Sequence, residues 1–396
     1  MIIDLHIHGC YSRATSKNLD LKNLEKWAKV KGVDLLGTGD FTHPKWIEEI
    51  KNNLVEQPSG LLVSKTGFPF MLQTEVSLVY TKEGKGRRVH NLVLAPSLEV
   101  VNQITDWLLT KGRVDYDGRP IFKIPCPEFV EALRKISPEI EIIPAHIWTP
   151  WFSMFGSNSG FDSLKDCFQD QAKHIHAIET GISSDPAMNW RLKQLDNINI
   201  VSFSDLHSFW PWRLGREATI LNTKKNYKDI INSLRTGQGL TGTIETSPSY
   251  GKYHFTGHRD CNICVDPKKS KELNFICPKC NKQMTRGVAE RVEELADRPE
   301  GYIRPNAPEV YTLLPLHELI ASIYGIKSFT SKKAFELYNN LISHFKSEYD
   351  ILIHISEEEL YKVAEPSLVK LIMQNRKGEL KLKPGYDGVY GELILE

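Results

Sequence analysis

The chain has 396 residues, of which 41% are hydrophobic and 25% are charged, and its formal net charge is +1. This composition is typical of a globular protein with a large core, and it excludes a strongly basic nucleic-acid coat protein. The length predicts two or three domains. No segment approaches the roughly 20 apolar residues that span a bilayer. The start of the chain shows no signal peptide, so we expect a cytoplasmic protein with no membrane partner.

Residues 1–247 alternate between short β-rich runs and helical patterns. The predicted strands are Ile2–Ile7, Leu35–Thr38, Met71–Tyr80, Val89–Ala95, Ile142–Pro144, Ala177–Glu179 and Ile198–Ser202. The predicted helices are Leu21–Lys31, Pro44–Leu54, Leu98–Lys111 and Tyr227–Thr236. Glu83–Arg88 is expected to form a hairpin turn. The alternation favours an α/β fold with a mainly parallel sheet or barrel.

The composition changes near residue 250. Residues 252–286 hold two pairs of cysteines and eight Lys or Arg against three acidic residues. From about residue 306 the pattern is helical, with a capping box at Ser356 and Glu359, and the chain closes with the turn-rich run Pro384–Gly391. We therefore predict a barrel over 1–247, a zinc module over 248–305 and a helical region over 306–396.

Histidines and carboxylates gather where the predicted strands end. His6 and His8 are two residues apart, so they point to the same face of the first strand. The remaining members are Asp40, Glu75, His90, His146, Asp205 and His207. A single histidine beside a strand is usually structural, but eight such residues at successive strand ends are hard to attribute to chance. They predict a site for two or three divalent ions such as Zn, Mn or Mg.

The order of these residues resembles the polymerase and histidinol phosphatase (PHP) superfamily of metallo-phosphoesterases, which implies a distorted (β/α)7 barrel. The resemblance implies that His6, His8, Glu75 and Asp205 hold one ion. It implies that Glu75 bridges to a second ion held by His90 and His146, and that Asp40 and His207 hold a third. The superfamily usually has another His or Asp soon after the first motif, and residues 9–19 contain neither. This departure makes a third ion uncertain, and His43 is an alternative ligand or a structural residue.

Clustered divalent ions activate water and clamp phosphate oxygens, so the site predicts hydrolysis of a phosphoester. Glu75 and Asp205 would act in catalysis through the metals and a metal-bound hydroxide. No Ser-His-Asp or Cys-His nucleophile is evident in the sequence. The metals predict the reaction, but they do not identify the ester.

A second metal site is predicted by the cysteine pairs. Cys261, Cys264, Cys277 and Cys280 form two C-x2-C pairs twelve residues apart, a spacing typical of one structural zinc. The zinc would stabilise a small fold that lacks a core of its own. The basic residues around it would suit phosphate contacts, although a run of charge is usually only a solvated face.

Aromatic and basic residues follow two of the predicted metal ligands and the first cysteine pair. The candidate DNA-binding residues are Trp151, Trp210, Trp212, Arg213, Arg216, Lys268 and Lys269. The rings could stack on a base displaced from a duplex, or they could simply cover the mouth of the barrel.

The whole chain resembles the endonuclease Q family, in which a PHP barrel precedes a four-cysteine zinc module and a helical region. The likeness lies in Gly37–Pro44, Glu179–Pro186, Leu214–Thr219 and Pro384–Gly391. It implies a repair nuclease that cuts double- or single-stranded DNA on the 5′ side of deaminated bases (hypoxanthine, uracil, xanthine) or abasic sites. Some archaeal members carry a sliding-clamp motif, which this chain lacks, so a clamp partner is not expected. The alternatives are a phosphatase or exonuclease acting on small phosphoesters or DNA ends, and a DNA-binding scaffold without catalysis.

Overall fold

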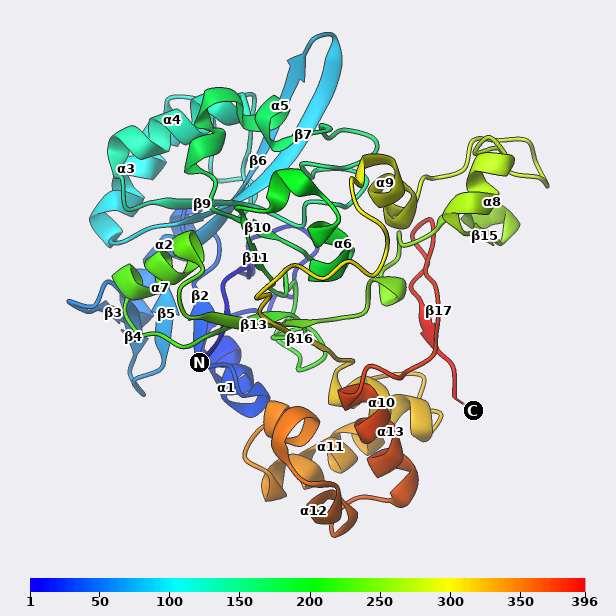
Figure 1. Ribbon diagram of the computed structural model, residues 1–396. Coiled ribbons are helices and arrows are strands. Elements are labelled where there is room, and N and C mark those ends of the chain that lie inside the picture. The colour runs from blue at the N-terminus through cyan, green and yellow to red at the C-terminus, as the bar shows by residue number, and fades with distance from the viewer. Residues whose placement is uncertain (396) are drawn as a thin grey trace.

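The structure, a computed structural model, describes residues 1–395 and shows a mixed α/β body with a small module beside it and a group of helices below it (Figure 1). The strands of the body are β1 Ile2–Asp4, β2 Leu35–Gly37, β3 Leu54–Glu56, β4 Leu62–Ser64, β5 Pro69–Met71, β6 Gln73–Lys82, β7 Lys85–Leu94, β8 Ile121–Phe122, β9 Glu141–Pro144, β10 Ala177–Glu179, β11 Asn199–Val201, β12 Ala218–Leu221 and β13 Leu240–Glu245. Its helices are α1 Leu21–Lys31, α2 Pro44–Asn53, α3 Leu98–Leu109, α4 Cys126–Ile136, α5 Leu164–Phe168, α6 Pro186–Trp190 and α7 Tyr227–Thr236.

The strands of the body close into an irregular ring. β1 pairs in parallel with β2 and antiparallel with β12, and β2 pairs in parallel with β5, which leads into β6. β6 pairs antiparallel with β7, and β7 pairs antiparallel with β9. The parallel pair β10–β11 is joined to its neighbours by Ile147 N–H to Glu179 O (3.1 Å) and Ser202 N–H to Thr219 Oγ1 (3.0 Å). The ring is the predicted α/β barrel, but its pairing is mixed rather than mainly parallel.

Local sequence signals explain where the helices and the hairpin begin and end. Asp20 caps α1 by accepting from Asn23 N–H, and Gly32 ends it with a φ of 95°, which a glycine adopts without steric cost. The predicted turn over Glu83–Arg88 is shorter in the structure. Glu83 and Gly84 have φ values of 53° and 73°, so they form a two-residue turn. The long β6–β7 hairpin therefore projects far from the body (Figure 1).

The module that contains the paired cysteines lies at one side of the body (Figure 1). It consists of β14 Thr256–His258, β15 Ile263–Val265, α8 Pro267–Glu272 and α9 Val288–Leu295. Arg291 in α9 is buried and donates to the carbonyl oxygens of Phe155 and Phe161, each at 3.1 Å. These bonds fix the module to the loop that follows β9.

The C-terminal part is mainly helical, as predicted. Its elements are β16 Glu309–Thr312, α10 Leu316–Ile323, α11 Lys332–His344, α12 Glu357–Tyr361, α13 Pro366–Arg376, β17 Leu382–Lys383 and β18 Glu392–Leu393. The capping box at Ser356 and Glu359 is confirmed. β16 extends the sheet of the body by pairing with β13, and the buried Lys31–Glu348 ion pair (2.6 Å) joins α1 to the helices. The domain boundaries stay a prediction. No helix within residues 1–395 is both long enough and apolar enough to cross a membrane.

Candidate metal centre

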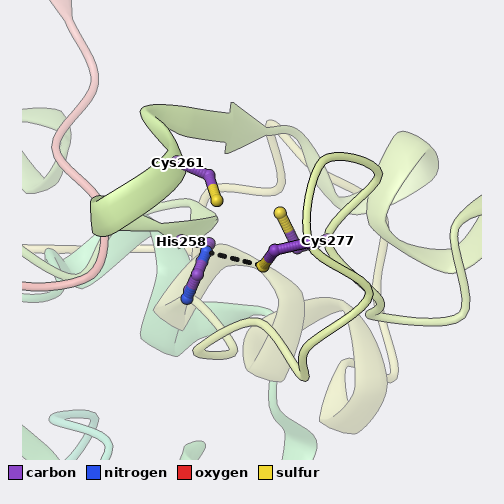
Figure 2. A group of neighbouring side chains, drawn as sticks. His258, Cys261 and Cys277 are labelled. Atoms are coloured by element: carbon purple, nitrogen blue, oxygen red, sulfur yellow. Dashed lines mark hydrogen bonds between the residues drawn. The ribbon is translucent and has the colours of Figure 1, made fainter.

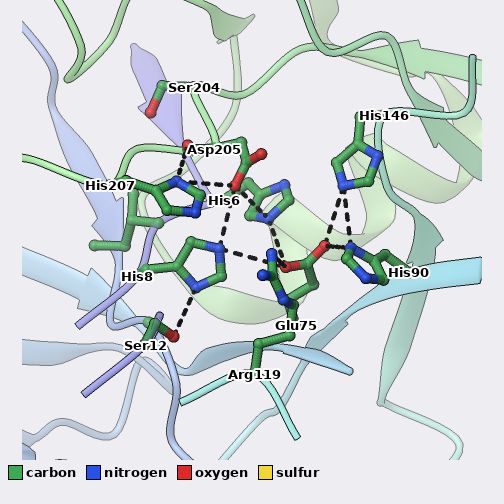
Figure 3. Close-up of polar contacts among 12 residues, drawn as sticks. His6, His8, Ser12, Glu75, His90, Arg119, His146, Ser204, Asp205 and His207 are labelled. Carbon is green, nitrogen blue, oxygen red and sulfur yellow. Dashed lines mark hydrogen bonds and ion pairs between the residues drawn. The ribbon is translucent and has the colours of Figure 1, made fainter. Parts of the chain in front are cut away.

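Two groups of potential metal ligands meet at Glu75 in the mouth of the barrel (Figure 3). The first group is His6, His8, Glu75 and Asp205, and the second is Glu75, His90 and His146. Within each group the ligand atoms lie within 4.8 Å of one another. The structure thus brings together the residues that the superfamily resemblance assigns to the first two ions. Glu75 belongs to both groups.

Strand register places these side chains on one face. His90 in β7 lies directly opposite Ser77 in β6, and Glu75 is two residues before Ser77. Because side chains two residues apart on a strand share a face, Glu75 and His90 point the same way. His6 and His8 follow β1 with the same spacing, and both are fully buried. Period-two geometry therefore aims both pairs into the barrel.

The backbone at this mouth is strained. Asp40, His146 and Asp205 follow strand ends and have φ values of 38°, 30° and 46°, a region that non-glycine residues rarely adopt. Each such residue costs about 1–3 kcal/mol, and such strain collects at functional sites. Gly181 passes so close to His146 that a Cβ on it would lie 2.5 Å from the His146 Cβ. The surroundings thus hold His146 in its unusual position.

The hydrogen bonds of the histidines show that the site fits a cation. Nδ1 of His6 lies 2.9 Å from Glu179 Oε1, and Nδ1 of His8 lies 2.9 Å from Asp40 Oδ1. In neutral rings these bonds place the proton on Nδ1 and leave a lone pair on Nε2. Nε2 of His8 faces Asp205 Oδ1 at 3.1 Å, and Nε2 of His6 has no hydrogen-bond partner although it is buried. Lone pairs that face carboxylate oxygens repel unless a cation or a proton lies between them.

The charges at the centre agree with this arrangement. Burial would raise the pKa of Glu75, but His90, Arg119 and His6 hold it well below its usual value. The pKa of Asp205 is likewise lowered, because His6 and His207 outweigh its burial. Burial lowers the pKa of His90 to about 4. At neutral pH both carboxylates are therefore anionic, the form that binds divalent ions. Burial would lower the pKa of His6 and His8, but the surrounding carboxylates raise it well above the usual value, so these rings hold protons that a bound divalent ion would displace.

The third predicted ion is not supported by the structure. Asp40 uses Oδ1 for His8 and uses Oδ2 for the N–H of Gly9 (2.7 Å) and the hydroxyl of Ser12 (2.8 Å). Neither Asp40 nor His207 joins a group of three ligands within residues 1–395. Ser12 occupies the segment where the superfamily has a His or Asp, and it donates to Asp40. Asp40 therefore orients His8, and its role as a metal ligand stays a prediction.

The alternative ligand His43 also lies outside both groups within the described residues. Its ring stacks on Tyr11 with centroids 4.6 Å apart, and it is the residue directly before α2. His207 lies at the edge of the centre, where its ring centroid is 4.8 Å from that of His8. Both histidines have pKa values lowered by burial. The structural interpretation of His43 is therefore the better one.

Sequence reasoning missed two residues that contact the ligands. Glu179 accepts from His6 Nδ1 and also from the backbone N–H of His146 (2.7 Å), so one carboxylate positions a ligand from each group. Arg119 donates to Glu75 Oε2 at 3.1 Å. Glu179 is the last residue of β10, and most of the other site residues also stand at or just beyond strand ends, so that position could have identified it. Arg119 lies in a loop with no comparable signal.

The zinc module differs from the four-cysteine prediction at one position (Figure 2). The potential ligands that gather there are His258, Cys261, Cys277 and Cys280, with all ligand atoms within 4.8 Å. Cys264 is exposed and lies outside this group. In the β14–β15 ladder Cys264 lies opposite Gly257, one position from His258, so Cys264 and His258 point to opposite faces. The side chain of Cys264 turns instead toward the carbonyl oxygen of Pro384.

The candidate DNA-binding residues divide into buried and exposed ones. Trp210 and Trp212 stack on each other (5.4 Å) and pack against Phe335 of α11, and Trp212 and Arg216 are only 6% exposed. Trp212 and Arg216 are buried, so the structure does not support their contact with DNA, whereas the DNA role of the partly buried Trp210 stays a prediction. The candidates that are exposed or partly exposed are Trp151, Trp210, Arg213, Lys268 and Lys269.

The chain is similar to several known proteins. Residues 315–379 match the family described as the MJ0043 C-terminal domain. The chain is 32% identical over 252 residues to the protein MJ0043 of Methanocaldococcus jannaschii, a match that covers 62% of this chain but only 31% of that protein. It is 28% identical over 410 residues to the protein YqxK of Bacillus subtilis, a match that covers 98% of both chains.

Two solved structures are similar over the whole chain. The lesion-specific endonuclease PfuEndoQ of Pyrococcus furiosus has a TM-score of 0.89 and 32% identity, with 100% of this chain and 95% of that chain covered. A structure of endonuclease Q in complex with a 27-mer duplex substrate, with an abasic lesion at the active site, also has a TM-score of 0.89 and 32% identity. In that case 100% of this chain and 97% of the other are covered.

Proposed function

Because the chain belongs to the endonuclease Q family, we propose that it is a metal-dependent DNA repair endonuclease. It cuts the phosphodiester on the 5′ side of a deaminated base or an abasic site in double- or single-stranded DNA. The observation that carries this proposal is the pair of ligand groups that share Glu75. A bridged pair of cations suits the hydrolysis of a phosphodiester. A DNA substrate also fits the predicted cytoplasmic location.

The side chains of this protein prepare the site for two divalent ions. When bound, such ions lower the pKa of a coordinated water and stabilise the charge that develops on the phosphate. Glu179 and Asp40 hold the rings of His6 and His8 with Nε2 toward the centre. Arg119 holds Glu75 from the solvent side and keeps the bridging carboxylate ionised. Glu179, Asp40 and Arg119 are thus positioning residues, whereas Glu75 and Asp205 supply the negative charge that binds the ions.

Selectivity for damage has a physical basis in this arrangement. The metal centre is buried in the barrel mouth, so the bond to be cut must leave the regular duplex to reach it. Deaminated bases pair poorly, and an abasic site has no base to unpair, so both distort at a lower free-energy cost than an intact base pair. The substrate classes are those that the family resemblance implies.

We also propose that one zinc ion is held by His258 and by Cys261, Cys277 and Cys280. Three thiolates and one imidazole are a common ligand set for structural zinc. The module contains few buried apolar side chains of its own, among them Cys277, Met284 and Val288. A zinc ion would therefore provide much of its folding free energy.

A nicking assay tests the proposed activity. Labelled duplexes and single strands that carry hypoxanthine, uracil, xanthine or an abasic site would be incubated with Mg²⁺, Mn²⁺ or Zn²⁺, and the product ends would be mapped. We expect cuts on the 5′ side of the lesion and no cuts in the undamaged duplex. Glu75→Gln should remove the activity, and Glu83→Gln at the exposed hairpin tip is the matched control. Equal cutting of damaged and undamaged duplexes would contradict the proposal.

A further inference from the structure

The turn-rich run Pro384–Gly391 forms a loop that packs beside the zinc module (Figure 1). Gly385 N–H and Gly391 N–H donate to the carbonyl oxygens of Ser249 (2.9 Å) and Tyr250 (3.0 Å). A Cβ on either glycine would overlap the backbone of 249–251, so this close approach requires glycine at both positions. The loop is therefore built to lie on the segment that connects the barrel to the module.

Asp387 fixes the same loop to the module. Its Oδ2 accepts from the backbone N–H of Arg259 (2.6 Å), and its Oδ1 accepts from the hydroxyl of Thr285 (2.7 Å). Both oxygens of this carboxylate are thus engaged in hydrogen bonds. These bonds partly neutralise its negative charge.

The docked loop presents Tyr390, whose ring is 41% exposed, to solvent. Nζ of Lys252 lies 5.7 Å from the centroid of the Tyr390 ring and 5.7 Å from that of Tyr253. The ring of Tyr253 in turn contacts Trp151, which is 38% exposed, at 5.8 Å, and the guanidinium of Arg213 lies 5.9 Å from Tyr390. We call the five residues Trp151, Tyr253, Lys252, Tyr390 and Arg213 the aromatic-basic arc.

Both ends of the arc stand on loops that carry ligands of the metal centre. Trp151 is five residues after His146, so it lies at most about 18 Å from it along the chain. The hydroxyl of Thr149 bonds to both residues, at 3.2 Å from His146 Nδ1 and 2.9 Å from Trp151 O. Arg213 is eight residues after the ligand Asp205. The arc therefore begins and ends within a few nucleotides' reach of the centre, because each nucleotide of a duplex strand rises about 3.4 Å.

The charge of the arc suits a polyanion. Within residues 1–395 neither Lys252 nor Arg213 forms an ion pair with a carboxylate within 4.0 Å. Both cations instead lie over tyrosine rings, where the face of the ring favours positive charge. Arg213 also lies in the field of the buried Glu318, where it partly offsets the rise in pKa that burial causes, whereas no carboxylate lies within 4.0 Å of Lys252 in the described residues. Exposed rings with cations between them are the combination that binds the bases and phosphates of an unstacked strand.

We propose that the aromatic-basic arc binds the DNA strand next to the bond that is cut, with an unstacked base on Tyr390 or Trp151 and phosphates on Lys252 and Arg213. This proposal rests on the proposed nuclease function and extends it to a binding surface that includes the C-terminal loop. The loop is then part of the substrate site, although it begins 179 positions after Asp205, the barrel metal ligand nearest to it in the sequence.

The test is a binding measurement in the presence of Ca²⁺, with fluorescence anisotropy of a labelled duplex that carries an abasic site. Tyr390→Ala and Trp151→Ala are each expected to raise the Kd about tenfold, the effect of losing one stacked base. Lys252→Ala should reduce the slope of log Kd against log salt concentration by about one. Tyr361→Ala, at an exposed tyrosine of α12, is the matched control and should leave Kd unchanged.

The outcomes distinguish a failure of the aromatic-basic arc to bind DNA from a failure of the proposed nuclease function. If the wild-type protein cuts lesions but the Tyr390, Trp151 and Lys252 variants all bind DNA with the wild-type Kd, the arc does not bind DNA. If the wild-type protein cuts no lesion, the proposed function fails and this proposal fails with it. Trp151 lies on a different element from the loop, so it tests the arc even if Tyr390→Ala disturbs the docking. Tyr390→Phe keeps the ring and should retain the affinity.

Discussion

The zinc module allows a decisive test, because one histidine and one cysteine are the alternative candidates for its fourth ligand. The sequence spacing favours Cys264 as the fourth ligand, and the structure favours His258. We expect Cys264→Ser to keep the metal and His258→Ala to lose it. The two substitutions lie on opposite faces of the same short ladder, so each is the control for the other.

The geometry gives this prediction its magnitude. In a tetrahedral site with Zn–S about 2.3 Å and Zn–N about 2.05 Å, the S to N edge is about 3.6 Å. The observed distance from Cys280 Sγ to His258 Nδ1 is 3.5 Å, close to that edge although no ion is present. Loss of a residue that only supports a ligand already weakens metal binding about 10- to 100-fold. Loss of His258 itself should therefore weaken zinc binding by more than about 100-fold.

Cobalt substitution is the suitable assay. The ligands of the barrel include no cysteine, so the thiolate-to-cobalt absorption reports the module alone. Cys264→Ser should retain the wild-type absorption and cobalt affinity, and His258→Ala should need a far higher cobalt concentration. Because the module depends on its metal for folding, His258→Ala should also lower its resistance to proteolysis. Loss of the band in Cys264→Ser with retention in His258→Ala would refute the assignment and restore the four-cysteine site.

Three further outcomes are expected. Glu75→Gln should lower nicking to the background of the assay, while the Kd for DNA changes less than about threefold, because the ions and not the DNA depend on this carboxylate. The control Glu83→Gln should cut normally. Residual nicking by Glu75→Gln would argue against a bridging role for Glu75. Trp212→Ala should reduce the free energy of unfolding by about 3–5 kcal/mol in urea titrations, because the ring packs between the barrel and the helices. If stability were unchanged and only the cutting of duplex DNA were lost, Trp212 would instead contact DNA. Burial raises the pKa of Glu217 to about 8. Between pH 4.5 and pH 8 the unfolded chain therefore binds fewer protons than the folded chain. The free energy of unfolding should fall as the pH rises through that window. Glu217→Gln should flatten this dependence in urea titrations at pH 6 and pH 8.5, and equal slopes for both proteins would contradict it.

The parts of the site that local geometry determines could be predicted from the sequence. His6 and His8 share a face because strand side chains alternate with a period of two, and Glu75 and His90 meet because a tight hairpin fixes the register of β6 and β7. The capping box at Ser356 and Glu359 is also local, and it is confirmed. Such features depend on residues within one element or on two neighbouring strands.

Contacts between distant segments could not be predicted in the same way. Glu179 and His6 are 173 positions apart, and nothing in either segment indicates their hydrogen bond. Trp212 follows a metal ligand along the chain, but its contacts are with α11, more than a hundred positions later. For Cys264 the spacing itself was ambiguous, because His258 precedes Cys261 by the same interval that separates Cys261 from Cys264. Only the register of β14 and β15 distinguishes the two residues.

The two metal sites are expected to affect different steps, because they are connected to the aromatic-basic arc by different loops. Trp151 and Arg213 stand on the loops of His146 and His207, so a strand bound by the aromatic-basic arc would be positioned relative to the barrel ions. Misplacement by about 1 Å can cost about 100-fold in rate, so Trp151→Ala should lower kcat as well as affinity. The zinc module contacts this surface through the C-terminal loop, by way of bonds from Arg259 and Thr285 to Asp387 and from Tyr386 to Asn262. Loss of its zinc should therefore weaken DNA binding and leave single-turnover cutting at saturating protein nearly unchanged, and a large fall in the saturated rate would show that the module also shapes the metal centre.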